Sequence, residues 1–339
     1  MPAFPPDDER PQRHAAKGTS SMTSAGFEVL TMGRVGVDVY PDQVGVGLED
    51  VQTFRTYLGG SPTNVAVAAA RHGRRAATIT RVGDDPFGRL VRRSFARYAV
   101  DDRFLSEAPG LQTPVTFCEM FPPDHFPIYF YRPSAPDLTV GPDEVDLAAV
   151  RDAEVFWATV TGLSIEPSRS ATLAALRARR DRRRTILDLD YRPQLWPSRE
   201  DARGQVQKAM RHVGVVVGNI DEFDTAVGVR DPKGAAQAAL DAGVSLAVVK
   251  RGPDGVLALD ADGLVEIPAV RVEVVNGLGA GDAFGGALCH GLLAGWPLDR
   301  TLRFANAAGA IVATRIACSD AMPMTAEVER FLAEVPDGG

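Results

Sequence analysis

The stretch Asn276-Gly-Leu-Gly-Ala-Gly-Asp-Ala-Phe-Gly-Gly-Ala-Leu-Cys-His290 decides how the rest of the chain is interpreted. It begins with small residues and reaches a single carboxylate, Asp282, after which apolar residues recur at four-residue spacing at Phe284, Leu288 and Leu292. That spacing predicts a buried helix. A helix entered through residues without large side chains presents unpaired N–H groups and the positive end of its dipole, which suits a phosphate.

Asp282 can be interpreted in two ways. In the first turn of a helix, its carboxylate could take a proton from an attacking hydroxyl. It could also simply cap a core helix, because Asp favours helix N-termini. On this stretch alone the two interpretations carry about equal weight.

Composition limits the classes of protein to consider. The chain has 339 residues, 45% of them hydrophobic, which is enough for one large or two unequal domains. Its net charge of −7 argues against a nucleic-acid partner. The three cysteines have neither metal-ligand nor redox spacing, so we expect reduced, buried thiols at Cys118, Cys289 and Cys318.

The two ends of the chain differ in composition from the rest and are expected to be tails. Residues 1–25 are rich in Pro, Ser, Asp and Arg and lack an apolar core, so we predict a disordered tail rather than a signal peptide. A second tail is expected at 334–339. Since no apolar run is long enough to span a bilayer, we expect a cytoplasmic protein without a membrane partner.

Alternating strand and helix patterns predict an α/β fold. The expected strands lack a polar face, which is typical of a mostly parallel sheet covered by helices on both faces. Strands are expected at 27–37, 77–82, 153–160, 185–189, 213–218 and 245–250, with a hairpin at 255–267. Helices are expected at 61–73, 86–98, 167–179, 201–211, 221–227, 233–242, after Asp282, at 298–314 and at 326–331.

The first half of the chain contains two runs whose composition differs from that of the other expected strands. Residues 113–121 and 126–132 are aromatic and β-branched and are separated by a Pro-Pro-Asp turn. Two such runs inside an α/β chain predict a small sheet packed beside the main domain.

Polar residues follow several of the expected strands. Ligands of open α/β sheets lie beyond the carboxyl ends of the strands, so these residues are candidates for a site. They are Asp38, Asp188, Asp190, Arg192, Asn219, Glu222, Lys250 and Asp282. Each alone is more often a cap or turn residue, but together they are carboxylates interleaved with cations, which suits phosphate and Mg²⁺ chemistry.

Several familiar motifs are missing from the sequence. It contains no G-x-x-x-x-G-K-[ST], and no complete G-x-G-x-x-G follows a strand. G-x-S-x-G, H-E-x-x-H and C-x-x-C are also lacking. These absences exclude a P-loop enzyme and leave a dehydrogenase without its dinucleotide fingerprint.

Four short motifs, taken together in order and spacing, resemble those of the ribokinase-like (PfkB) carbohydrate kinases. They are Gly-Gly-Ser-Pro-Thr-Asn at 59–64, Asp-Leu-Asp-Tyr-Arg at 188–192, Asn-Ile-Asp-Glu at 219–222 and Gly-Ala-Gly-Asp at 279–282. The resemblance covers about residues 26–333. It implies a ribokinase-like kinase domain with a small β-sheet lid, whose strands would lie within about 39–58 and 104–132.

Further stretches are similar to one branch of that family, whose members phosphorylate 5-dehydro-2-deoxy-D-gluconate in myo-inositol catabolism. These stretches are 32–41, 59–71, 114–119, 129–132, 134–137 and 275–286. The implied activity is ATP-dependent phosphorylation of the primary C6 hydroxyl. Two alternatives stay open: a kinase of 2-dehydro-3-deoxygluconate or another sugar, and, in a different class, a non-catalytic sensor of sugar or nucleotide.

The resemblance also implies a role for each motif residue. Asp282 would be the base, Gly279, Ala280 and Gly281 the anion hole, and Arg192 a phosphate ligand. The sugar acid would be bound by Asp38, Gly59, Gly60, Asn64 and Arg132. ATP would be bound by Asn219, Glu222, Lys250, Gly252, Gly255 and Asn306, with Glu222 ordering water around Mg²⁺.

Some of these implications have competing explanations. Arg132 could instead be a surface Arg on an edge strand. Asn276 stands where the family often has an Asp that coordinates a monovalent cation, so its neutral oxygen leaves K⁺ activation open. Asp190 replaces the usual Asn of D-x-N-x-R. Family members often dimerise through their lid strands, so a homodimer is also expected.

Overall fold

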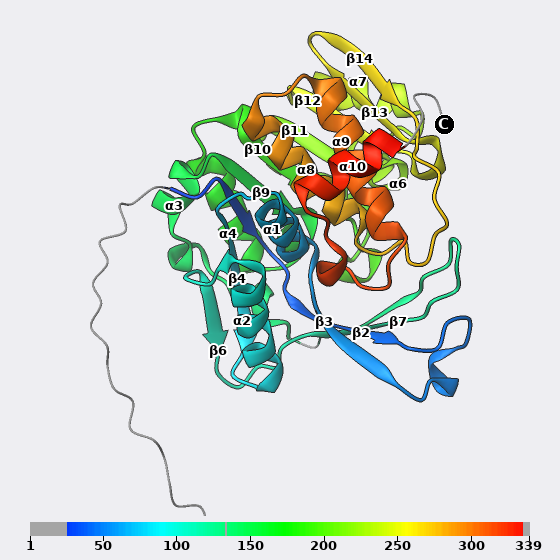
Figure 1. Cartoon of the computed structure of the whole chain (residues 1–339). Helices are drawn as coiled ribbons and strands as arrows, with labels where there is room; N and C mark the ends of the chain where they lie inside the picture. Colours follow the sequence, from blue (N-terminus) through cyan, green and yellow to red (C-terminus); the bar gives the residue numbers. More distant parts are fainter. Residues whose placement is uncertain (1–25, 133, 335–339) are drawn as a thin grey trace, which may run out of the picture.

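Two β-sheets organise residues 26–132 and 134–334, which are the residues described by this computed structural model (Figure 1). The predicted tail at 1–25 lies outside the described residues. The second predicted tail, 334–339, lies outside them except for Glu334, which ends the last helix.

The main sheet is mixed and mostly parallel, as predicted. Within the described residues it has ten strands in the order β14-β13-β12-β11-β10-β9-β1-β4-β5, with β6 also paired to β4. Its antiparallel pairs are β12–β13 and β13–β14, and the second of these is the hairpin predicted at 255–267. The strands are β1 (Val29–Met32), β4 (Ala76–Gly83), β5 (Val100–Asp101), β6 (Leu105–Ala108), β9 (Val155–Thr159), β10 (Thr185–Asp188), β11 (Val215–Asn219), β12 (Leu246–Lys250), β13 (Val256–Asp260) and β14 (Gly263–Ile267).

Helices cover both faces of this sheet. One hydrophobic core contains residues of α1, α2, α8, α9 and α10, and a second contains residues of α3, α4, α5, α6 and α7. The helices are α1 (Ser61–Arg71), α2 (Pro86–Tyr98), α3 (Leu147–Asp152), α4 (Ser168–Ala178), α5 (Arg199–Met210), α6 (Ile220–Val227), α7 (Pro232–Asp241), α8 (Ala280–Ala294), α9 (Leu298–Ala313) and α10 (Thr325–Glu334). Among these described helices, none has the length and apolar character needed to cross a membrane.

Helices α1 and α8 lie against each other through very small residues. A Cβ built on Gly286 would lie 2.3 Å from the Cβ of Ala68, and one built on Gly285 would lie 2.7 Å from the ring of Trp157. Both distances are shorter than real contacts allow, so only glycine fits at these positions. This close approach brings the start of α1 next to the start of α8.

The lid sheet has four strands in the order β3-β2-β7-β8 and confirms the predicted small second sheet. Its strands are β2 (Gly36–Pro41), β3 (Phe54–Gly59), β7 (Val115–Cys118) and β8 (Ile128–Tyr131). Strands β2 and β7 are parallel, and the two outer pairs are antiparallel. In Figure 1 labelled strands of this sheet (β2, β3 and β7) extend away from the main body, below α8 and α10.

The prediction of one strand over 27–37 is wrong. The chain forms β1 in the main sheet, turns at residues 33–35 and enters β2 in the lid sheet. Both strands are largely buried, so the apolar pattern continues through the turn and hides it. Strand β6 was also not foreseen: it lies in the range expected for lid strands but pairs with β4.

Short 3₁₀ turns connect several elements. They are η1 (Leu48–Asp50), η2 (Pro136–Thr139), η3 (Pro142–Glu144), η4 (Val160–Leu163), η5 (Arg182–Arg184), η6 (Pro193–Leu195), η7 (Gly252–Asp254) and η8 (Ser319–Ala321).

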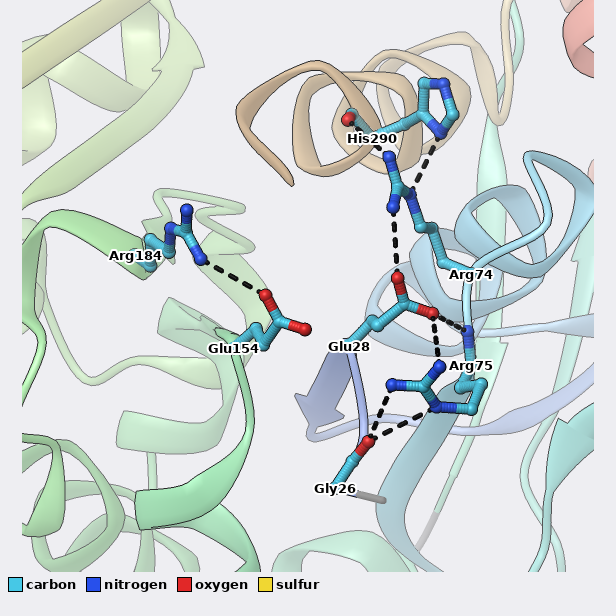
Figure 2. A network of polar contacts seen from close by, with 7 residues as sticks. All are labelled: Gly26, Glu28, Arg74, Arg75, Glu154, Arg184 and His290. Atoms are coloured by element: carbon cyan, nitrogen blue, oxygen red, sulfur yellow. Dashed lines mark hydrogen bonds and ion pairs between the residues drawn. The ribbon is translucent and has the colours of Figure 1, made fainter. Parts of the chain in front are cut away.

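A polar network just before β1 links β1, the end of α1 and α8 (Figure 2). Glu28 accepts hydrogen bonds from the Arg74 guanidinium and from the Arg75 backbone N–H, both at 3.0 Å. Arg74 also donates to Nδ1 of His290 at 3.1 Å, and Arg75 donates to the carbonyl of Gly26. The network therefore fixes the amino-terminal edge of the sheet, away from the strand ends where a ligand is expected.

Candidate active site

A cavity of about 260 Å³ lies where the carboxyl ends of the main-sheet strands, the start of α8 and the lid sheet meet. Most of the predicted site residues line it: Asp38, Asn64, Asp188, Asp190, Arg192, Asn219, Glu222, Lys250, Gly279, Gly281 and Asp282. Residues that sequence reasoning did not select also line it, among them Arg34, Tyr40, Ser61, Thr116, Cys118, Ile128 and Cys318.

Asp282 is held by two side chains from α1. The Ser61 hydroxyl donates to Oδ1 at 2.8 Å, and the Asn64 amide donates to Oδ2 at 2.8 Å. The N-cap of α8 is Gly279, and among the described residues no side chain caps this helix. The alternative interpretation, in which Asp282 merely caps the helix, is therefore wrong.

Asn64 is in turn oriented by Ser319, from η8. The Ser319 hydroxyl shares its proton between Oδ1 of Asn64, at 2.6 Å, and the carbonyl of Leu58, at 2.7 Å. Because the amide oxygen of Asn64 accepts from Ser319, its amide nitrogen is turned toward Asp282. The sequence carries no signal for Ser319, whereas Ser61 lies one helical turn before Asn64 inside a motif already identified.

The cavity collects carboxylates whose charged form is disfavoured. Burial raises the pKa of Asp38 to about 6 and raises the pKa of Asp188, Glu222 and Asp282 as well. Lys250 lies among these acids. Burial opposes the charge of Lys250, but the neighbouring carboxylates more than offset this and raise its pKa.

Arg192 forms an ion pair with Asp190 in which the N···O distance is 2.6 Å. The charge of Asp190 is the main cause that raises the pKa of Arg192. The other oxygen of Asp190, Oδ2, is buried and has no hydrogen-bond partner among the described residues.

Asn219 and Glu222 form a capping box at the start of α6. The backbone N–H of Asn219 donates to Oε2 of Glu222 at 2.7 Å, and the N–H of Glu222 donates to Oδ1 of Asn219 at 2.9 Å. Their spacing thus has a local structural cause, yet both side chains also face the cavity.

Gly59 and Gly60 were predicted to contact the ligand but do not line the cavity. A Cβ on Gly59 would lie 2.2 Å from the carboxyl carbon of Asp38. Gly60 has a φ of 107° and is the N-cap of α1. These glycines therefore allow Asp38 and the start of α1 to approach each other.

Other predicted residues also lie outside the cavity lining. Asn306 donates to the carbonyl of Pro268 at 2.8 Å. Gly252 begins η7, and a Cβ on Gly255 would lie 2.1 Å from the carbonyl oxygen of Ile267. Ala280 is the first residue of α8 behind Gly279.

Asn276 is fully buried, and both ends of its amide are bonded to the backbone. Its Nδ2 donates to the carbonyl of Ile316 at 2.5 Å, and its Oδ1 accepts from the N–H of Leu278 at 3.0 Å. The side chain therefore fixes the loop that leads into α8.

Arg132 does not line the cavity, and the alternative that it is a surface residue is wrong. Its guanidinium donates to both oxygens of Asp137, at 2.9 and 2.8 Å. The two side chains are only 5% and 3% exposed, so this is a buried ion pair, in which Nε of Arg132 has no hydrogen-bond partner among the described residues.

The three cysteines are free and buried, as predicted. Cys118 and Cys318 line the cavity. The hydroxyl oxygen of Tyr40 lies 2.8 Å from the sulfur of Cys318. Burial raises the pKa of both thiols, so they remain protonated near neutral pH.

Comparison with known proteins gives one consistent result. A model of the pfkB family of carbohydrate kinases matches residues 27–325. A protein from Geobacillus kaustophilus named 5-dehydro-2-deoxygluconokinase is 31% identical over 319 residues, covering 92% of this chain and 95% of the relative. A protein of the same name from Photobacterium profundum is 35% identical, covering 88% and 92% of the two chains.

Solved structures agree with this fold. An Escherichia coli protein described as ribokinase II, in complex with ATP and Mg²⁺, superposes with a TM-score of 0.83 at 23% identity over 91% of this chain and all of that one. A fructokinase double mutant from Vibrio cholerae, solved with fructose, ADP and a potassium ion, has a TM-score of 0.79 at 26% identity. It matches 91% of this chain and 100% of its own.

Proposed function

The chain belongs to the pfkB family of carbohydrate kinases, and on that premise we propose that it transfers the γ-phosphoryl group of ATP to the C6 hydroxyl of 5-dehydro-2-deoxy-D-gluconate. The observation that carries this proposal is Asp282 in the first turn of α8, facing a cavity shared by the strand ends and the lid sheet. The names of the relatives support the sugar acid as substrate and, with it, a role in myo-inositol catabolism.

Asp282 is the proposed base. Its carboxylate takes the proton of the sugar hydroxyl while that oxygen forms a bond to the γ-phosphorus, and the bond from phosphorus to the ADP oxygen breaks. Burial raises the pKa of Asp282, which makes the carboxylate a better proton acceptor. The hydrogen bonds from Ser61 and Asn64 keep it oriented.

The start of α8 is the proposed anion hole. The backbone N–H groups of Gly279, Ala280 and Gly281 stand at the positive end of a 15-residue helix. Donors fixed in this way stabilise negative charge on the transferring phosphoryl group without reorganising. Arg192, which also lines the cavity, contributes a positive charge toward the phosphates.

ATP is proposed to bind along Asn219, Glu222 and Lys250, with Gly252, Gly255 and Asn306 farther along the nucleotide. The carboxylate oxygens near Glu222 are suited to Mg²⁺, and they include the unpartnered Oδ2 of Asp190. No group of three or more His, Cys, Asp or Glu side chains among residues 26–132 and 134–334 is arranged to hold a metal directly. The proposed Mg²⁺ would be held through water and the phosphates, whose charge it would neutralise.

A dependence on K⁺ is not expected. Both polar atoms of the Asn276 amide are bonded to the backbone, and the carbonyl of Ile316 accepts one of those bonds. Where a carboxylate would bring a negative charge, Asn276 therefore offers a monovalent cation only a neutral oxygen that already accepts a hydrogen bond. The expected result is equal turnover in K⁺ and in a quaternary ammonium salt.

The sugar side of the site is proposed to use Asp38 and Asn64, with Gly59 and Gly60 allowing the two segments to approach. The three free thiols are consistent with a reducing compartment such as the cytoplasm. A homodimer is proposed to form through the lid sheet, where Phe54 and Tyr131 are 40% and 63% exposed.

A panel of substrates tests the proposal. ADP release would be measured with 5-dehydro-2-deoxygluconate, 2-dehydro-3-deoxygluconate, fructose and ribose, each with and without K⁺. The highest kcat/KM is expected for 5-dehydro-2-deoxygluconate. Equal or better turnover of 2-dehydro-3-deoxygluconate would contradict the narrower substrate, and strong K⁺ activation would contradict the interpretation of Asn276.

A further inference from the structure

Arg34 lies between the main sheet and the lid sheet. It lies in the turn at 33–35 that joins β1 to β2, and its side chain lines the cavity together with Asp38. Its guanidinium carbon lies 5.2 Å from the centre of the Phe130 ring, which belongs to β8 of the lid sheet. Arg34 thus connects the main sheet, the cavity and the lid sheet.

The other cations in or near the cavity each lie against a carboxylate, and only Nε of Arg132 and Nε of Arg192 stay without a hydrogen-bond partner among the described residues. Arg132 donates two hydrogen bonds to Asp137, and Arg192 pairs with Asp190 at 2.6 Å. Lys250 lies among carboxylates that raise its pKa. By contrast, the Arg34 side chain has neither an ion pair nor a hydrogen bond to any residue within 26–132 and 134–334.

The contact with Phe130 restrains Arg34 without using its N–H groups. An arginine stacked on an aromatic face keeps its guanidinium plane fixed while the edge of the fork stays free. A fixed, planar fork is suited to a carboxylate, which it can bind with two parallel hydrogen bonds. A phosphate is a weaker candidate for the ligand of Arg34. The residues proposed to bind phosphate, Gly279 and Arg192, lie on other elements.

Asp38 lies within electrostatic range of both Arg34 and Asp282. The pKa of Asp38 is raised mainly by burial, is lowered by Arg34 and is raised further by Asp282. A six-carbon sugar acid has its carboxylate at C1 and the reacting hydroxyl at C6, at opposite ends of the chain. Its middle hydroxyls could meet Asp38 while its ends reach Arg34 and Asp282.

We propose that Arg34, and not Arg132, binds the carboxylate of the sugar-acid substrate and so selects acids over neutral sugars. This inference rests on the proposed function, because it requires an acid substrate. In this proposal Arg132 has a structural role: its buried ion pair with Asp137 supports the end of β8.

The test compares Arg34→Gln and Arg34→Lys with the wild-type protein. Each would be assayed with its best sugar acid and with the neutral analogue that carries an aldehyde in place of the carboxylate. The matched control is Arg55→Gln, which removes one positive charge from β3 of the lid sheet at a side chain that is 69% exposed. Binding of ATP would be measured separately.

Arg34→Gln is expected to lower kcat/KM for the acid about 10- to 100-fold, mainly through KM, as expected for a lost hydrogen bond between charged groups. The neutral analogue should change little, Arg34→Lys should recover part of the loss, and Arg55→Gln should behave like wild type. An equal loss with both substrates, or an unchanged KM for the acid, would overturn the role of Arg34.

The outcomes also separate this inference from the proposed function. If wild type prefers 2-dehydro-3-deoxygluconate, the narrower substrate is wrong, and the Arg34 test proceeds unchanged with that acid. If wild type phosphorylates neutral hexoses better than any sugar acid, both the substrate class and the role of Arg34 are wrong.

Discussion

Asp282 receives its hydrogen bonds from residues 218 and 221 positions earlier in the chain. Ser61 and Asn64 both lie in the first turn of α1, so the orientation of the base depends on how α1 packs against α8. At the scale of single residues, this is the arrangement that separates a kinase from a sensor, because a sensor would need no oriented carboxylate at the anion hole.

Replacement of Asp282 by Asn tests the base directly. The amide cannot accept the proton, so kcat should fall by about 10³-fold or more. Binding of ATP, measured by calorimetry, should stay nearly unchanged. Full activity in this variant would contradict the assignment of the base.

Asp38 should make both activity and stability depend on pH. Burial raises its pKa from 3.8 to about 6, so between these values the folded chain holds a proton that the unfolded chain has released. The contribution of this group to the free energy of unfolding therefore falls as pH rises through that window. Below about pH 6 the protonated carboxyl should also bind sugar hydroxyls less well, which lowers kcat/KM.

Asp38→Asn should accordingly raise the melting temperature at pH 7.5 and leave it nearly unchanged at pH 4. Thermal unfolding at the two pH values measures this difference. The KM for sugar should increase in the same variant. An identical change in melting temperature at both pH values would argue against a raised pKa.

Most of the residues that line the cavity could be predicted, because polar residues at strand ends share one edge of the sheet. Arg34, which lines the cavity, and Ser319, which does not line it but orients Asn64, could not. Ser319 contacts Asn64 across 255 positions of sequence, and nothing near it marks that contact. For Arg132, sequence could not reveal that Asp137, five positions later, folds back onto its guanidinium.

At the scale of elements, the start of α8 depends on Gly279. Its φ is +83°, and a Cβ there would lie 2.8 Å from the sulfur of Cys318. Gly295, at the other end of α8, also has a positive φ, of +65°, but its added Cβ would meet no neighbour within 4 Å among the described residues. The two glycines cap the two ends of α8, so Gly295 serves as the matched control for a substitution at Gly279.

Gly279→Ala should lower kcat at least about 100-fold, since displaced N–H groups would no longer stabilise the transferred charge. It should also destabilise the fold by about 1–3 kcal/mol through backbone strain. Gly295→Ala should produce strain of the same order with kcat near wild type. Steady-state kinetics and thermal unfolding of both variants would check this, and equal losses of kcat would argue against the anion hole.

Elements with clear end signals were predicted closely. Helix α2 begins at Pro86 behind the capping side chain of Asp85 and ends at Tyr98, as expected from the sequence. Strands β5 and β6 were missed because they are only two and four residues long and are held by pairing with β4. The turn at 33–35 was missed because buried strands of two different sheets have the same apolar pattern.

At the scale of the whole molecule, the lid sheet carries an aromatic row made of Phe54, Phe117 and Tyr131. Their ring centroids are 5.7 and 5.4 Å apart along the row. Tyr131 is 63% exposed, and exposed aromatic clusters often mark protein interfaces. A second copy of the chain is the proposed partner.

Tyr131→Asp should therefore convert a dimer to a monomer, because it places a charge in the middle of that interface. Light scattering coupled to size-exclusion chromatography measures the mass. Ile165→Asp, at a residue that is 52% exposed outside the lid sheet, should keep the wild-type mass. A monomeric wild-type protein at micromolar concentration would contradict the proposed dimer.

The hydrogen bonds that join Ser61, Asn64, Asp282 and Ser319 also have a consequence for synthesis of the chain. The ribosome completes α1 long before it reaches α8, so the apolar surface of α1 that later meets α8 stays uncovered for more than half of translation. Premature termination before η8 would leave the base without its full set of partners. Two complementary fragments, divided in a surface loop between α1 and α8, should therefore be inactive when assayed separately. Kinase activity in a mixture of the two fragments would then measure their reassembly.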